Sequence, residues 1–253
     1  MIGRWYIFFL LISLSSFTDD SFKDEQLRYA RVRQAYADKG LGMQELLAEK
    51  KLETDQLRLY LRAFKKEKKI ELWGKKSSDS FYQHIKTYRV CQTSGGSGPK
   101  RQQGDLQIPE GFYHINLFNP HSHFYLSLGI NYPNRSDQIL GVRNNLGGEI
   151  FIHGACVTIG CLPITDPGIK ELYIFCVEAK NNGQTKIPVT IFPSELTETE
   201  FSRLSMRNQS DSDKMGLWTD LKKGYNIFNE KKQLPIIEFL PSGRHAVTEA
   251  VYP

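Results

Sequence analysis

Seven residues separate a histidine from a cysteine in the segment His153-Gly-Ala-Cys-Val-Thr-Ile-Gly-Cys161. A cysteine attacks a carbonyl as its thiolate, and a histidine close in space can take the thiol proton. Cys161 is therefore the candidate nucleophile, and His153 is the candidate general base that later acts as an acid. The pair predicts acyl transfer through a covalent thioester.

The residues around this pair can hold it in place. The apolar run from Ile150 to Ile152 predicts a buried strand that ends at the histidine. Gly154, without a side chain, lets another backbone or a substrate approach closely. Gly160 predicts a tight turn, in which the amides of Ile159 and Gly160, with that of the cysteine, face the oxygen of an attacked carbonyl. The segment thus contains candidates for an oxyanion hole.

Two other interpretations use the same residues. A histidine beside a cysteine on an apolar segment can simply be a packed pair in the core. His153, Cys156 and Cys161 could also bind zinc, but four residues between two cysteines is not a common zinc spacing. We therefore expect no metal site.

The segment resembles the signature of the L,D-transpeptidase (YkuD-like) catalytic domain. In that family a histidine followed by glycine or serine precedes a Ser/Thr-His-Gly-Cys element, and the YafK-like branch has the short gap seen here. This chain has Thr158-Ile159-Gly160-Cys161 and so carries Ile159 where the family has its second histidine. The resemblance implies a β-rich α+β catalytic domain that uses Cys161 and His153.

The resemblance also implies roles for other residues. The carbonyl of Gly154 would fix the tautomer of His153. The run from Tyr125 to Asn134 is similar to the YafK-like branch as well. The substrate contacts expected from this similarity are Tyr125, Ser127, Asn131 and Thr158.

The activity implied is directed at peptidoglycan stem peptides, in cell-wall biogenesis and cell shape. Cys161 would attack the carbonyl of the diamino acid at the third position and release D-alanine. An acceptor amine would then give a 3-3 cross-link, whereas water would make the chain an L,D-carboxypeptidase or an amidase that releases a group attached to the diamino acid. A non-catalytic envelope-binding protein is the alternative from another class. No cofactor is implied.

Residues 1–18 are typical of a secretory signal peptide. Arg4 precedes an apolar run from Trp5 to Leu14, and small and polar residues follow. A run of about ten residues is too short to span a hydrocarbon core of ~30 Å. We expect an exported protein of the periplasm or cell envelope with no membrane span after signal removal; a retained N-terminal anchor is the alternative.

The 253 residues carry a net charge of +5, which lies in one region. Residues 24–76 contain 14 Lys/Arg and 9 Asp/Glu, whereas residues 77–253 contain 17 of each. In an exported chain this excess favours an anionic envelope polymer or a lipid surface over nucleic acid, which we do not expect as a partner. The run from Lys65 to Lys69 could also be the solvated face of a helix.

The pattern of apolar residues predicts an α+β fold. The N-terminal part is expected to be helical, with an interruption at Gly40 and Gly42 and a third helix that starts near Thr54 and contains Leu57, Leu59 and Leu61. Farther along, Asp166 is expected to cap a helix over 167–180. The expected organisation is a signal peptide (1–18), a helical N-terminal extension (19–68), a catalytic domain (69–193) and a C-terminal extension of helices and a strand packed on it (194–253).

The chain has four cysteines, and export would allow disulfides to persist. If Cys161 is a free nucleophile, then Cys91, Cys156 and Cys176 leave an odd number to be paired. A bridge between Cys156 and Cys161 would silence the site. The sequence leaves the disulfide pairing and the oligomeric state open.

Overall fold

The computed structural model describes residues 20–250, so the expected signal peptide lies outside the described residues. Within that range no helix is both long and apolar enough to cross a membrane. The elements are α1 (Phe22–Leu27), α2 (Ala30–Glu49), η1 (Thr54–Gln56), β1 (Leu57–Phe64), β2 (Lys69–Lys76), β3 (Gln83–Arg89), β4 (Gly111–Asn119), β5 (Ser127–Ile130), α3 (Arg135–Leu140), β6 (Phe151–His153), β7 (Leu162–Pro163), α4 (Thr165–Asn181), β8 (Ile187–Phe192), α5 (Glu198–Asn208), α6 (Ser212–Lys231), β9 (Ile236–Phe239) and β10 (His245–Thr248).

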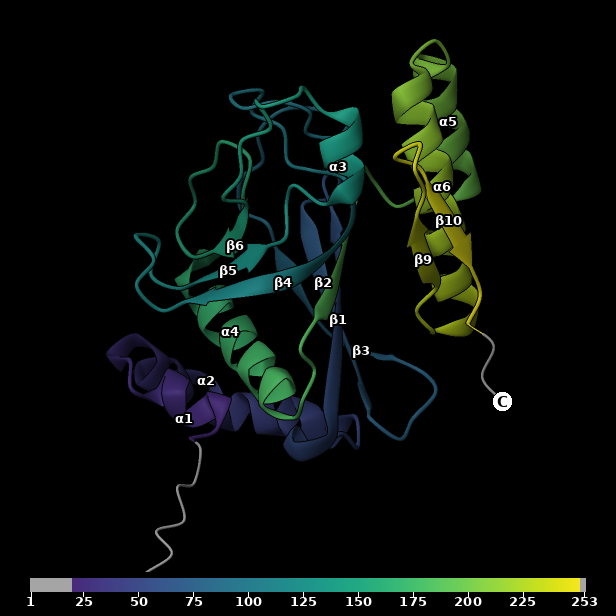
Figure 1. Ribbon diagram of the computed structural model, residues 1–253. Coiled ribbons are helices and arrows are strands. Elements are labelled where there is room, and N and C mark those ends of the chain that lie inside the picture. Colours follow the sequence, from purple (N-terminus) through teal and green to yellow (C-terminus); the bar gives the residue numbers. More distant parts are fainter. Residues whose placement is uncertain (1–19, 251–253) are drawn as a thin grey trace, which may run out of the picture.

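The centre of the fold is an eight-stranded sheet of order β3-β2-β1-β8-β4-β5-β6-β7 (Figure 1). β1 pairs in parallel with β8, and β6 pairs in parallel with β7. The other neighbours are antiparallel. Helices cover both faces of this mixed sheet, and the α+β class predicted from the sequence is confirmed.

The third N-terminal helix predicted from the sequence is wrong, because residues 57–64 form strand β1. Leu57, Leu59 and Leu61 recur at every second position, which is the period of a strand, and all three lie in the main core. Tyr60 and Phe64, on the opposite face, pack in two other clusters. The boundary expected at residue 68 therefore separates β1 from β2, which pair along their whole length.

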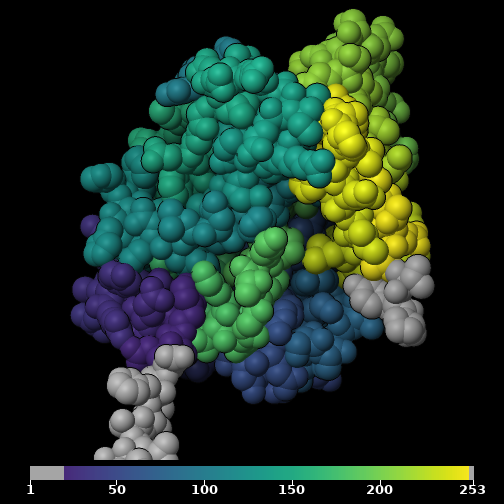
Figure 2. Space-filling model, in the orientation of Figure 1, coloured from purple at the N-terminus to yellow at the C-terminus, as the bar shows by residue number. Residues whose placement is uncertain are grey.

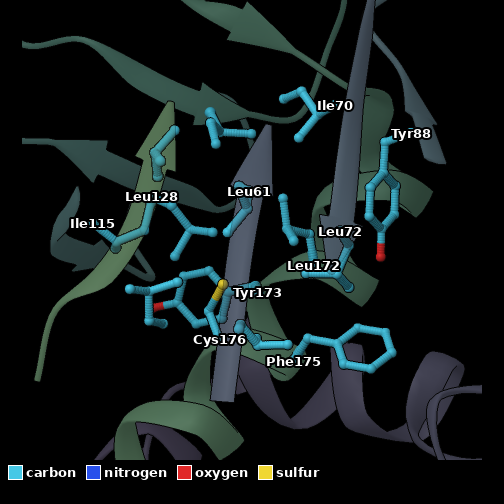
Figure 3. Packing of buried hydrophobic residues seen from close by; sticks show 14 of the residues in the cluster. Leu61, Ile70, Leu72, Tyr88, Ile115, Leu128, Leu172, Tyr173, Phe175 and Cys176 are labelled. Atoms are coloured by element: carbon cyan, nitrogen blue, oxygen red, sulfur yellow. The ribbon is translucent and has the colours of Figure 1, made fainter. Parts of the chain in front are cut away.

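One face of the sheet is covered by α4, on which α1 and α2 pack in turn. Figure 3 shows this core, with Leu61 and Leu72 from the sheet above Leu172 and Cys176 from α4. The interruption expected in α2 is also wrong, since the helix continues through both of its glycines. A glycine costs a helix about 1 kcal/mol, and packing of the buried face of α2 against α4 outweighs that cost.

The opposite face is covered by the C-terminal elements α5, α6, β9 and β10. Trp218 of α6 is fully buried against Phe64 and Phe192 of the sheet. Its indole Nε1 donates a hydrogen bond of 2.7 Å to Glu110 Oε2 at the start of β4. Figure 2 shows the C-terminal hairpin, in yellow, beside the teal surface of residues near α3.

The basic run from Lys65 to Lys69 is the turn between β1 and β2 and not a helix face. Lys65 Nζ lies 2.9 Å from Glu110 Oε1, and Lys66 Nζ lies 2.8 Å from Glu200 Oε2. Lys69 is paired with two further carboxylates. Two of these four lysines, Lys66 and Lys69, therefore join the sheet to carboxylates of the C-terminal part, and Lys65 joins β1 to the start of β4.

Candidate active site

Two adjacent parallel strands carry the histidine and the cysteine. β6 ends at His153, and β7 begins directly after Cys161, with Ile152 opposite Leu162 in the register. Cys161 therefore stands next to the strand that ends at His153. Within the described residues, no hydrogen bond joins the thiol to the imidazole. The fold thus places the pair on neighbouring strands, with the two groups not yet in direct contact.

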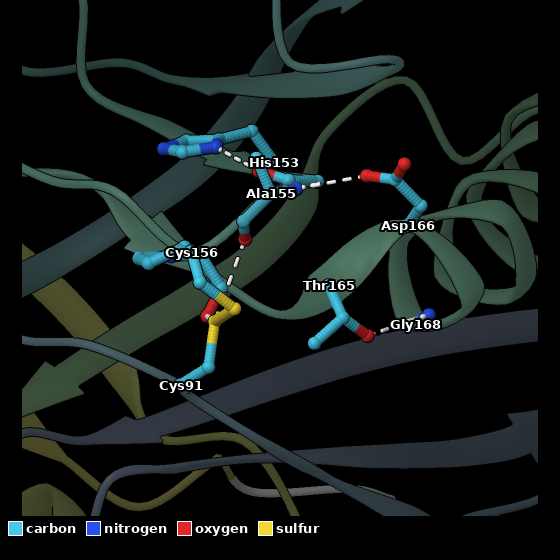
Figure 4. The surroundings of a disulfide bond; sticks show 9 residues. Cys91, His153, Ala155, Cys156, Thr165, Asp166 and Gly168 are labelled. Carbon is cyan, nitrogen blue, oxygen red and sulfur yellow. Dashed lines mark hydrogen bonds between the residues drawn. A yellow bond between two sulfur atoms is a disulfide. The ribbon is translucent and has the colours of Figure 1, made fainter.

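His153 is held as a neutral base. The ring is 1% exposed and stacks on Phe124 with centroids 4.5 Å apart. Its Nδ1 lies 2.5 Å from the Gly154 carbonyl oxygen, to which it donates (Figure 4). Burial lowers the pKa of His153, and the carbonyl only partly opposes this. The proton is therefore on Nδ1, and Nε2 is left to accept a proton.

Cys161 is half-buried, with its sulfur 3.6 Å from the Glu149 carbonyl oxygen. Burial raises the pKa of its thiol, and the negative charge of Glu149 adds to that effect. Lys100 acts in the opposite direction. The resting site therefore holds a thiol and a neutral imidazole, and the proton must move when a substrate is attacked.

The turn before Cys161 is closed by the hydroxyl of Thr158. Its Oγ1 accepts hydrogen bonds from the amides of Gly160 at 3.2 Å and Cys161 at 2.7 Å, and it donates to the Cys161 carbonyl at 2.8 Å. Two of the amides expected to bind an oxyanion are thus satisfied internally, because a threonine hydroxyl competes for nearby backbone donors. The side chain of Ile159, in the same turn, is 79% exposed. An oxyanion that binds the Gly160 amide would have to displace the Thr158 hydroxyl from that amide.

The loop after His153 is anchored twice, as Figure 4 shows. The Ala155 amide donates a 2.8 Å hydrogen bond to Asp166 Oδ1 in the first turn of α4. Cys156 forms a disulfide with Cys91, which leaves Cys161 and Cys176 as the free cysteines of the described chain. The cap expected at Asp166 is wrong, since α4 begins at Thr165 and Asp166 holds the loop instead. A disulfide-bonded Cys156 also has no thiolate to offer a zinc ion.

Cys161 opens onto a pocket of about 280 Å³ between two glycine-rich loops. Two charged residues of opposite sign, Lys100 and Glu149, line it, with Ile159 and Leu106 as apolar partners. Lys100 is itself buried and pairs with Asp105 at 2.7 Å. Neither charged residue was predicted from the sequence, although Glu149 directly precedes the apolar run Ile150–Ile152 that leads to the histidine.

The comparison with known proteins identifies the family. No protein-family profile matches the chain. YafK of Escherichia coli strain K12, an L,D-transpeptidase by name, is 35% identical over 193 residues, which are 76% of this chain and 74% of YafK. A YafK of Escherichia coli O157:H7 matches to the same extent.

The chain belongs to the YafK-like L,D-transpeptidase family. The resemblance found in the sequence is confirmed by this match. Among solved structures, the helical cell shape determining protein Pgp2 of Campylobacter jejuni has a TM-score of 0.44 at 19% identity, over 74% of each chain. Bd1075 of Bdellovibrio bacteriovorus has a TM-score of 0.39 at 18% identity, over 71% of this chain and 76% of that one. The assignment to the YafK-like family rests on the sequence match alone.

The other contacts expected from the YafK-like pattern lie apart from the cysteine. Lys170 Nζ lies 4.9 Å from the ring centroid of Tyr125, and Ser127 is buried in β5. Asn131 Oδ1 accepts a 2.7 Å hydrogen bond from the His114 amide. Among the described residues that line the Cys161 pocket, none of the three is present. Ser127 does pair with His153 across β5 and β6, which makes it a neighbour of the base through the backbone.

Proposed function

We propose that this YafK-like chain is a cell-envelope enzyme that acts on peptidoglycan stem peptides by acyl transfer through Cys161. One observation carries the proposal: a half-buried thiol opens onto a pocket beside a strand that presents a neutral histidine with a free Nε2. General-base activation of the thiol also needs Nε2 within hydrogen-bond distance of the sulfur, a contact that we expect to form when substrate binds.

The first half of the proposed reaction forms a thioester. The thiol proton of Cys161 passes to Nε2 of His153 as sulfur attacks the carbonyl of the third residue, a diamino acid. The carbon–nitrogen bond to D-alanine then breaks, and the imidazolium returns its proton to the leaving amine. Because Nδ1 stays bonded to the Gly154 carbonyl throughout, only Nε2 exchanges the proton.

The second half regenerates the thiol. An acceptor amine attacks the thioester, loses a proton to His153 and forms a new amide, as in a 3-3 cross-link. The exposed side chain of Ile159 at the pocket indicates that the thioester side is open, so water can replace the amine. Hydrolysis through the same intermediate, as an L,D-carboxypeptidase or an amidase, is therefore the second candidate.

Mass spectrometry of tetrapeptide muropeptides incubated with the purified protein tests this function. A cross-linked product with loss of D-alanine supports transpeptidation, and shortened monomers support hydrolysis. Cys161→Ala and Cys161→Ser should abolish either product. Cys176→Ala is the matched control, because it removes the other free thiol, which lies fully buried in the core.

Two results would contradict the proposal. Unchanged turnover in Cys161→Ala would exclude the proposed nucleophile. Binding of the muropeptide without turnover in the unaltered protein would favour a non-catalytic envelope-binding protein.

A further inference from the structure

A second hollow, of about 470 Å³, lies away from the 280 Å³ pocket at Cys161. Phe112 and His114 of β4 and Pro188 of β8 contribute from the sheet. Arg135, at the start of α3, and Ile237, in the C-terminal hairpin, also line it. Three separate parts of the fold thus enclose this space.

The hairpin that encloses the hollow is firmly held. Ser136 Oγ of α3 donates a 2.6 Å hydrogen bond to the Gly243 carbonyl at the hairpin turn. Arg244 pairs with Asp213 of α6 at 2.7 Å, and the His245 amide donates to Asp220 at 2.9 Å. With these contacts on two sides, the hollow is a fixed feature of the fold.

The hollow is cationic. Arg135 and Lys186 line it, and no described lining residue is an Asp or Glu. His114 also lines it, but burial lowers the pKa of its imidazole, so it adds no positive charge near neutral pH. The side chains of Arg135 and Lys186 make no hydrogen bond or ion pair with any other described residue. This contrasts with the run from Lys65 to Lys69, where most ammonium groups have a carboxylate partner. Unpaired cations around an apolar floor fit a ligand that carries carboxylates.

The position of the hollow relative to Cys161 limits which part of a substrate can reach it. β4, β5, β6 and β7 are consecutive in the sheet, so the second hollow and Cys161 are separated by about three strand spacings, or ~15 Å, measured across the strands alone. A smaller hollow of about 200 Å³ is lined by Leu117 of β4 and Gly129 of β5, and it shares Glu149 and Ile150 with the Cys161 pocket. An extended peptide needs about four or five residues to cover that distance. Residues next to the attacked bond therefore cannot fill the second hollow.

We infer that the second hollow binds a carboxylate-bearing stem peptide other than the one attacked at Cys161, a second stem of the same cross-linked substrate. This inference rests on the proposed function for the identity of the ligand. The carboxylates of the second stem would lie against Arg135 and Lys186, and its aliphatic parts would pack on Phe112 and Ile237. A substrate with two linked stems then occupies both sites at once and gains affinity by avidity.

Binding to purified Cys161→Ala protein, measured by calorimetry, tests the inference without turnover. The probes are a disaccharide-tetrapeptide monomer and its cross-linked dimer. We expect the dimer to bind about tenfold more tightly than the monomer, which is less than the roughly 10²- to 10⁴-fold that avidity can reach. Arg135→Glu/Lys186→Glu should abolish this preference and leave monomer binding within about twofold. Lys51→Glu/Lys223→Glu, which reverses two exposed lysines elsewhere, is the control of equal charge and should keep the preference.

The outcomes separate this inference from the proposed function. No dimer preference in the Cys161→Ala protein, or a preference that survives in the Arg135/Lys186 variant, would overturn the second site even if Cys161 proves to be catalytic. A preference that is lost only in that variant would support the site, even if muropeptide turnover by the unaltered protein is not observed.

Discussion

The Ala155 amide donates its hydrogen bond to Asp166 Oδ1 across 2.8 Å, and this contact joins the loop after His153 to the first turn of α4. The backbone between the base and the nucleophile is thereby fixed to α4, the helix that packs on one face of the sheet. Four predictions follow from this loop and its neighbours, and each can be measured separately.

Asp166→Ala should lower kcat/KM about tenfold, because the Ala155 amide loses its partner and the loop that positions His153 loosens. A lost hydrogen bond to a carboxylate costs about 1.5–3 kcal/mol. Asp166→Asn keeps an oxygen acceptor and should retain most of the activity. Steady-state kinetics of both variants on a muropeptide provide the check, and an Asn variant as damaged as the Ala variant would point to a role for the charge instead.

Gly154→Ala should destabilise the fold by about 1–3 kcal/mol. A β-carbon at this position would lie 2.4 Å from Asp166 Oδ1 and 2.5 Å from the Phe124 carbonyl oxygen, so backbone would have to move. Gly148→Ala is the matched control, since a β-carbon there has no atom of the described residues within 4 Å. Urea unfolding followed by circular dichroism measures both; equal stabilities would show that the loop adapts freely.

Reduction of the disulfide between Cys91 and Cys156 should lower both stability and activity. The two cysteines are 65 residues apart, and opening a loop of that length costs about 4 kcal/mol in the chain-entropy description. We expect the midpoint of urea unfolding to fall on addition of dithiothreitol. The Cys91→Ser/Cys156→Ser variant should already unfold at the lower urea midpoint, and dithiothreitol should not change that midpoint. A change in this variant would show that the reductant acts through another thiol.

The pH dependence should reflect a neutral pair. Because burial lowers the pKa of His153, the base stays unprotonated below the ordinary imidazole value of about 6.5. We therefore expect kcat/KM to be lost on acidification only below that pH. Because burial raises the pKa of Cys161, alkylation by iodoacetamide should be slow at pH 7 and still rising above pH 9. An alkylation rate that does not change with pH above pH 5 would instead indicate a thiolate–imidazolium ion pair.

The sequence predicted the features that depend on residue type and local period. The apolar run before His153 and the helical period in 167–180 correspond to β6 and α4. The glycine after His153 and the Thr158-Ile159-Gly160-Cys161 element, with the short gap between them, were sufficient to indicate the family by resemblance.

The same local rules gave wrong secondary structure where contacts with distant parts of the chain determine it. β1 was taken for a helix because Thr54 is a good helix cap, yet β2 and β8 pair with this segment, and α4 and α6 pack on its two faces. The glycines of α2 were taken for breaks, but α4 supplies packing that keeps the helix continuous. In each case the partner is remote in the chain, and a period alone carries no information about it.

The site divides in the same way. The types and spacing of residues 153–161 determined which groups are available for chemistry. Only the tertiary structure decided that Cys156 forms a disulfide with Cys91 and that Asp166 accepts a hydrogen bond from the loop after His153. It also showed that the Thr158 hydroxyl accepts hydrogen bonds from the amides of its own turn. It also placed Asn131 in the second hollow and Glu149 beside the nucleophile, because strand order and register, which follow from packing across the whole sheet, determine which side chains share a space.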